Sequence, residues 1–276
     1  MNLRAARLTL RPRDTADVLD LAAPFCLTNW RLFFPLCVLM LPSLAACWAA
    51  RGWLHWQWPA VWILAVGLGG VCQAPFTIAC GEVLFQGPEQ IVFNALSRRL
   101  VGRLPAFLTV HVLSRLLLLV AATFLILLPF VAAAFFVVHE AVLLEGFGPL
   151  AAFGRSGRAV RGHGTSVAMT ALALTLLPIF GVVAGELTGG ALVELVFQMG
   201  RPFGSLWTDG GSAYALIGFF LTIPLVCAAR FLKYVDLRTR KEGWDIQLRF
   251  MALAAGDQGQ GDGEAGQRAV SSTEAA

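Results

Sequence analysis

Charged residues are scarce in this chain. Of its 276 residues only 14% are charged and 57% are hydrophobic, and just two of the 21 basic residues are lysines. Soluble globular domains carry roughly 25% charged residues. The composition therefore excludes an ordinary soluble domain and a disordered chain, and it predicts a protein that lies in a bilayer. A nucleic-acid partner is not expected, because the basic residues form short clusters beside apolar runs rather than a continuous stripe.

Motifs for catalysis and for metal binding are also missing. The pair His139-Glu140 resembles the start of the zinc-protease motif HExxH, but Leu143 stands where the second histidine is required. There is no GxSxG nucleophile turn, and no glycine-rich loop carries the lysine of a phosphate site. The six cysteines form no CxxC pair, which favours buried and reduced thiols. We therefore expect no catalytic residue, no metal and no cofactor.

Long apolar runs fill most of the chain. A transmembrane helix takes about 20 apolar residues, so five or six spans can fit with short connections. The stretch 106–145 favours six, because it is too long for one span and Pro129 divides it into a hairpin. Its second arm is short for a full crossing, so a re-entrant arm stays an alternative. The expected spans, within one domain over 1–255, are 32–50, 60–85, 106–128, 130–145, 165–184 and 212–232.

The predicted fold class is thus all-α, a polytopic transmembrane helix bundle with cytoplasmic amphipathic helices. One such helix begins after Asp14, and a second over 89–104 is expected to lie along the membrane surface. Residues 256–276 are small and polar, which is typical of a disordered cytoplasmic tail. Glycines recur every fourth residue over 181–189, which predicts close packing against another helix, within the chain or across a dimer.

Arginine clusters set the expected orientation. With six spans, the clusters of the N-terminal region, of 98–103, of 155–161 and of the segment after 232 all fall on one side of the membrane. Because short basic loops stay in the cytoplasm, both termini are predicted to be cytoplasmic. These arginines would face the anionic lipid head groups of that leaflet, which are the expected partners.

Charged residues in or beside the spans are the candidate functional residues, since a charge in hydrocarbon is costly unless it is paired or hydrated. The carboxylates near the cytoplasmic interface suit an Arg–Glu collar that pins helix ends, which we favour, or a proton or substrate relay. The block after the last span alternates in sign and suits an internal network or a docking surface for a protein partner. The candidates are Glu82, Glu140, Glu145, Arg155, Asp236, Arg238, Arg240 and Glu242.

Three segments carry a family resemblance. They are LRPR at 10–13, the stretch 144–156 with its Glu145 and Arg155-Ser156, and YVDLRTRKEGWD at 234–245. They resemble motifs of a family of bacterial six-helix membrane proteins that is named by similarity to the membrane domain of glycerophosphoryl diester phosphodiesterase. The resemblance implies a multi-pass protein of the bacterial inner membrane. No catalytic phosphodiesterase domain is recognisable, so it implies no hydrolase activity.

Three functions are compatible with these features. A non-enzymatic scaffold, or a subunit of a membrane or envelope assembly, is favoured because no catalytic constellation is found. The alternative is a permease or lipid-handling membrane protein, which is indicated by prolines inside the spans, since broken helices commonly line transport paths. An intramembrane enzyme that uses His139, Glu140 and Glu145 is the third and weakest hypothesis.

Overall fold

The computed structural model describes residues 14–86, 93–124, 126–199 and 202–242. These residues are helical almost throughout and include no β-strand, which confirms the all-α prediction. The helices are α1 (Thr15–Thr28), α2 (Trp30–Val38), α3 (Leu41–Gly52), α4 (Trp58–Gln86), α5 (Phe93–Thr123), α6 (Leu128–Ala134), α7 (Val138–Glu140), α8 (Pro149–Val160), α9 (Gly164–Ala191), α10 (Leu206–Asp209), α11 (Ala213–Leu221) and α12 (Ile223–Glu242), with π-helical turns η3 (Ala141–Glu145) and η4 (Leu192–Val196).

Six helical segments among the described residues are long and apolar enough to cross a membrane. They are Trp30–Gly52, Trp58–Leu84, Ala95–Thr123, Leu128–Glu145, Gly164–Val196 and Ala213–Lys241. Their number agrees with the six-span prediction. The segment 256–276, the N-terminal motif 10–13 and the last part of the basic segment after the sixth span lie outside the described residues.

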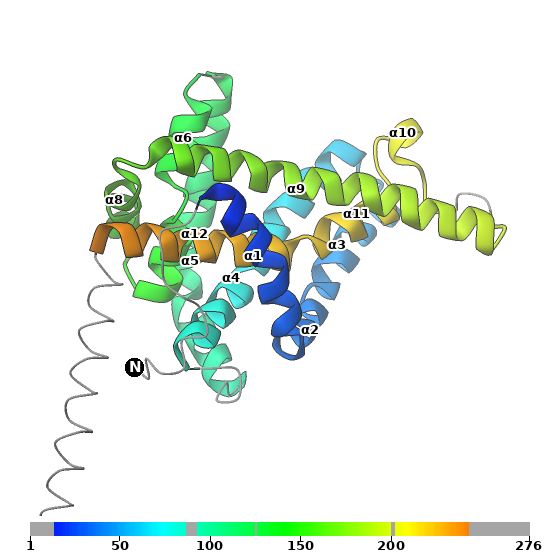
Figure 1. Ribbon diagram of the computed structural model, residues 1–276. Coiled ribbons are helices and arrows are strands. Elements are labelled where there is room, and N and C mark those ends of the chain that lie inside the picture. The colour runs from blue at the N-terminus through cyan, green and yellow to red at the C-terminus, as the bar shows by residue number, and fades with distance from the viewer. Residues whose placement is uncertain (1–13, 87–92, 125, 200–201, 243–276) are drawn as a thin grey trace, which may run out of the picture.

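Helices α9 and α12 run side by side through the middle of the molecule (Figure 1). Helix α1 packs across both of them and buries Val18, Ala22 and Phe25, which lie at helical spacing on one apolar face. Helix α4 packs against α12, and α5 crosses this pair steeply before the chain turns back through α6 (Figure 1). The ends of the molecule differ: α8 lies with the C-terminal end of α12 at one end, and α10 lies at the other (Figure 1).

Prolines mark where spans are divided. Pro42, Pro129 and Pro224 each occupy the first turn of a helix that follows an interruption, at the starts of α3, α6 and α12. Proline is tolerated in a first turn because its missing N–H would have no helical acceptor there. The hairpin predicted at Pro129 therefore turns just before it. Pro75 and Pro178, in contrast, lie inside the continuous helices α4 and α9.

The prediction of a separate surface helix over 89–104 is wrong for its described part. Residues from Phe93 onward form the first turns of α5, which continues through Pro105 to Thr123. The reason is packing: Leu96 is buried in the protein core, and Leu100 and Leu104 pack against that core. The apolar face that suggested a membrane surface instead contacts other helices, so nothing separates this segment from the span.

The glycine ridge of α9 packs within the chain, against α11. A Cβ added to Gly185 would lie 2.5 Å from the carbonyl oxygen of Tyr214 and 2.8 Å from Cα of Gly218. Gly181 and Gly218 meet in the same way. Backbones this close leave no room for side chains, so of the two alternatives for the ridge the structure contains the intrachain contact.

Candidate functional site

Polar groups inside the bundle converge on Arg230 of α12. Its guanidinium donates to Oε1 of Gln73 on α4 (2.9 Å), to the carbonyl oxygen of Phe136 (2.7 Å) and to Oε2 of Glu140 on α7 (3.2 Å). Nδ1 of His139 lies 3.1 Å from the same guanidinium. Since arginine has only donors, this ring nitrogen accepts, and a neutral His139 then carries its proton on Nε2. Three helices are thereby tied together inside the apolar core.

The break between α6 and α7 makes this arrangement possible. Residues 135–137 form a turn, so the carbonyl groups that precede it lack the usual helical partners. Arg230 binds the carbonyl oxygen of Phe136, and Oγ of Ser156 donates to that of Ala134 (2.6 Å). The turn also presents His139 and Glu140 to α12, immediately before the π-helical turn η3. Such π-turns often occur at functional sites.

The Arg230–Glu140 ion pair is buried. The Glu140 side chain is 1% exposed and that of Arg230 is 14% exposed. Charges buried this far are stable only when they are paired and hydrogen-bonded, and removal of one partner leaves the other uncompensated. Glu140 therefore lies apart from the predicted collar: it was expected near the cytoplasmic interface, but its partner is a cation inside the last span.

A cavity of about 430 Å³ opens beside this cluster, between α4, α5, α6, α9, α11 and α12. Its polar lining includes Gln73, His139 and Arg230, together with Arg115 from α5. Arg115 is exposed, and among the described residues its guanidinium has no hydrogen-bond or ion-pair partner. Two arginines thus line the cavity, and Glu140 is the one carboxylate beside them in the described part of the chain, which gives this part of the bundle a net positive charge.

Two histidines extend the polar cluster toward α5. The ring centroids of His111 and His139 are 5.6 Å apart, and Phe107 stacks on His111 at 5.8 Å. The His111 ring lies directly against Gly70 of α4, where any larger residue would clash with it. Both ring nitrogens of His111 and Nε2 of His139 are buried without a partner among the described residues. Buried polar atoms of this kind are normally satisfied by water or by a ligand.

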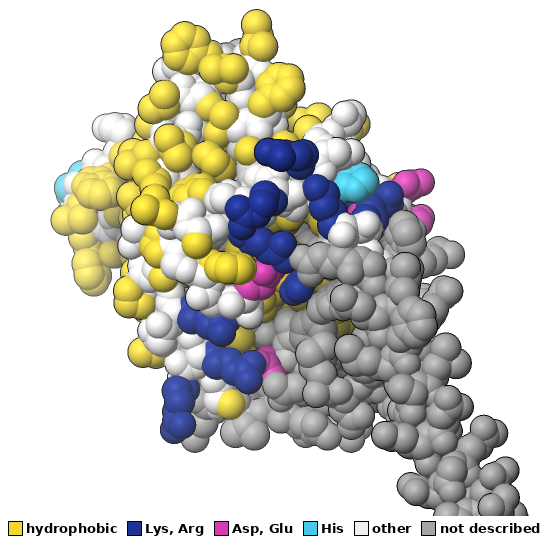
Figure 2. Space-filling model, turned by 90° about the vertical axis from the view of Figure 1, so that its left-hand side faces the viewer, with side chains coloured by type: hydrophobic (Ala, Val, Ile, Leu, Met, Phe, Trp, Pro, Cys, Tyr) yellow, Lys and Arg dark blue, Asp and Glu magenta, His cyan; other side chains and the backbone are white. Residues whose placement is uncertain are grey.

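A second group of charges lies at the basic end of the molecule, where lysine and arginine gather on one face (Figure 2). Glu145 accepts from Nε of Arg155 (2.9 Å) and from the hydroxyl of Tyr234 (2.7 Å), and Arg238 lies 3.8 Å from it. These contacts join η3, α8 and α12. Glu82 forms a separate ion pair with the exposed Arg99. Of the predicted collar, the structure thus pairs Glu145 with Arg155 and Glu82 with Arg99, and the collar's role stays a prediction.

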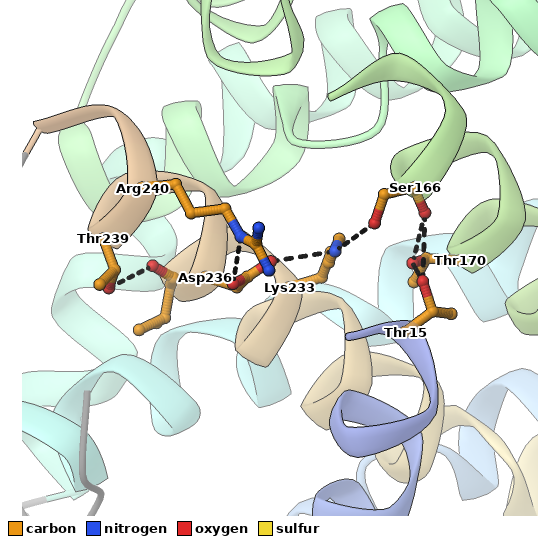
Figure 3. Close-up of polar contacts among 8 residues, drawn as sticks. Thr15, Ser166, Thr170, Lys233, Asp236, Thr239 and Arg240 are labelled. Carbon is orange, nitrogen blue, oxygen red and sulfur yellow. Dashed lines mark hydrogen bonds and ion pairs between the residues drawn. The ribbon is translucent and has the colours of Figure 1, made fainter. Parts of the chain in front are cut away.

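In the alternating block at the end of α12, Asp236 is buried and lies between Lys233 and Arg240 (Figure 3). Asp236 is 3% exposed and binds Lys233 Nζ (3.0 Å) with one oxygen and Arg240 Nε (2.8 Å) with the other. Lys233 also donates to Oγ of Ser166 on α9 (2.9 Å), beside the contact of Thr15 with α9. The block therefore ties α12 to α9. Helix α12 ends at Glu242, whose side chain lies outside the described residues.

Sequence reasoning missed Arg230, Gln73 and Lys233. The signal for Arg230 was available, because it is a charged residue inside the apolar run of the sixth span, and such residues are rare and usually functional or paired. Gln73 gave no comparable signal, since a single glutamine in a span is common enough to pass unnoticed. Their joint role becomes visible only when the helices are placed together.

Fold and cavity define the chain as a polytopic helical membrane protein with a buried charged cluster. No protein-family model, no curated protein and no solved structure matches it. The resemblance in the three motifs therefore stays a prediction. The described residues include no group of three or more His, Cys, Asp or Glu side chains placed to hold a metal ion.

Proposed function

We propose that this protein is a lipid-handling membrane protein that binds an anionic amphiphile in the cavity between its helices. The observation that carries the proposal is Arg115, whose guanidinium has no partner among the described residues and which lines a cavity of about 430 Å³ inside an apolar bundle. Ligand pockets typically measure about 300–1,000 Å³ and combine apolar walls with a few convergent polar groups. This cavity has both properties.

Charge gives the reason for an anionic ligand. An arginine in the middle of a membrane helix costs at least about 2.5–3.5 kcal/mol unless it is paired or hydrated. Glu140 is already engaged by Arg230, so among the described residues no carboxylate remains for Arg115, which requires water or a further counter-ion. An anionic head group would supply that counter-ion, and the guanidinium binds carboxylate and phosphate oxygens through paired N–H groups.

The lipid-handling proposal is preferred to a scaffold because carboxylates on and beside the last helix are already paired within the chain. Asp236 is buried between Lys233 and Arg240, and Glu145 is shared by Arg155 and Tyr234. Asp236, the described carboxylate of the predicted docking block, is thus satisfied by groups of the same chain. The cavity, in contrast, offers in Arg115 a charge without a partner among the described residues.

Lipid analysis of the purified protein tests the proposal. Protein solubilised from native membranes in a mild detergent should yield a stoichiometric anionic amphiphile on solvent extraction and mass spectrometry. Arg115→Gln should lose it, whereas Arg98→Gln, which removes an exposed arginine outside the cavity, should retain it. The proposal is overturned if the wild type carries no anionic amphiphile, or if both variants retain it equally.

A further inference from the structure

We infer that the ligand of this cavity is a single-chain amphiphile with a monoanionic head, bound with its head at Arg115 and its tail toward Trp62. This inference rests on the proposed function and makes it specific. It follows from three properties of the cavity: its charge, its length and the different character of its two ends.

The charge of the cavity fits a monoanion. Arg115 and Arg230 contribute two positive charges and Glu140 one negative charge, which leaves one positive charge to be balanced. A head group with one negative charge neutralises the site, whereas a dianion would leave a net negative charge in a low-dielectric region. Nε of Arg230 adds a buried donor without a partner among the described residues.

The head-group end is identified by the polar cluster. His111 lies one turn before Arg115 on α5, and its ring lies 5.6 Å from that of His139, which touches Arg230. His139 lines the cavity beside Arg230, and its Nε2, which has no partner among the described residues, is available at this end. A carboxylate or phosphate oxygen at this end could accept from the guanidinium of Arg115 and from Nε2 of His139.

The opposite end of the cavity is aromatic. Trp62 of α4 and Phe219 of α11 meet edge to face, with ring centroids 6.3 Å apart. The Trp62 indole N–H donates to the carbonyl oxygen of Gly210 (2.9 Å), which fixes the ring in place. Val66, Ile179 and Val182 line the wall at this end. A hydrocarbon tail is the part of a ligand that this surface accommodates, because it presents almost no hydrogen-bonding group.

The length of the cavity matches one acyl chain. Its lining on α4 extends from Trp62 to Gln73, eleven residues or about 16 Å of helix. Half of the bilayer hydrocarbon core, which one chain fills, is about 15 Å. The volume of about 430 Å³ lies in the lower part of the range for small-molecule pockets, which favours one chain over a complete two-chain lipid.

Competition binding tests the inference on the full-length protein in phosphatidylcholine nanodiscs. A fluorescent long-chain fatty acid serves as the probe, and the competitors are palmitate, a lysophosphatidylglycerol, diacyl phosphatidylglycerol, an alkyltrimethylammonium ion of equal chain length and inorganic phosphate. Both single-chain anions should displace the probe, and the other three should do so at least tenfold more weakly. The ranking of the two single-chain anions distinguishes a carboxylate head from a phosphodiester head.

Two variants test the placement of head and tail. Arg115→Gln should weaken probe binding tenfold or more. Val182→Trp should fill the aromatic end and shift the preference toward a shorter fatty acid, whereas Leu187→Trp, on an exposed position of the same helix, should not. Melting temperatures measured in parallel identify any variant that fails to fold.

The outcomes separate the inference from the proposed function. If diacyl phosphatidylglycerol competes as well as palmitate, the single-chain inference is overturned while the lipid-handling proposal stands. If inorganic phosphate competes as well as the amphiphiles, the tail has no role and the inference fails. If the probe does not bind at all and no anion stabilises the protein, both are overturned. An unchanged chain-length preference in Val182→Trp would contradict the placement of the tail.

Discussion

Arg230 collects acceptors from three helices, and this explains why a cation can be buried in the last span. Its guanidinium binds a side-chain amide, a carbonyl oxygen and a carboxylate, while Phe136 also places its ring 5.7 Å from the guanidinium carbon. Arg115 has none of these partners among the described residues. Two arginines in one cavity therefore have different roles: Arg230 holds the helices together, and Arg115 is available to a ligand.

The buried ion pair should dominate the stability of this region. Glu140→Gln leaves Arg230 with an uncompensated charge and is expected to lower the free energy of unfolding by roughly 3–5 kcal/mol. The control is Glu82→Gln, which breaks the ion pair with the half-exposed Arg99 and should cost less than about 1 kcal/mol. Thermal unfolding in detergent, followed by tryptophan fluorescence, measures both. Equal melting temperatures for the two variants would show that Glu140 is not a stabilising partner.

At the scale of helices, the apolar pattern predicted what each segment is but not what it contacts. The apolar residues over 93–104 indicated an amphipathic helix, and this segment is helical. Its apolar face packs against other helices of the protein and not against the membrane surface. A pattern of apolar residues is the same for either environment. The prolines were predicted as breaks, yet Pro75 and Pro178 are accommodated inside long helices, because neighbouring helices can compensate for the lost hydrogen bond.

The contact between α9 and α11 should tolerate no added side-chain atoms at its centre. Gly185→Ala would place a Cβ 2.5 Å from a backbone oxygen of α11, so the helices must separate, at a cost of about 1–3 kcal/mol. Gly190→Ala, on the same helix, meets nothing within 4 Å and should be neutral or slightly stabilising. Melting temperatures of the two variants test this difference. A Gly185→Ala protein as stable as Gly190→Ala would mean that the helices are not this close.

For the whole molecule, the sequence was sufficient to predict six spans but not the cavity. The spans depend on runs of neighbouring residues, which can be read along the chain. The cavity depends on Gln73, Arg115, His139 and Arg230, which come from four helices widely separated in sequence. No local pattern relates these positions. The gathering of positive and negative residues at helix ends, in contrast, is visible in the sequence, because these residues flank the apolar runs.

Topology is the remaining property that belongs to the whole chain, and the two ends of the molecule allow it to be tested. Arg158 on α8 and Trp207 on α10 are exposed at opposite ends (Figure 1). If the basic end is cytoplasmic, Arg158→Cys should react with a membrane-impermeant maleimide only after the cells are opened, and Trp207→Cys should react in intact cells.

The native Cys26, which lies outside the spans, should add little background labelling. Burial together with the nearby Cys37 raises the pKa of its thiol to about 11. It stays protonated near neutral pH, where only the thiolate reacts. Labelling of both positions from the same side would contradict the single crossing of α9 between α8 and α10. Labelling of position 158 in intact cells would reverse the predicted orientation.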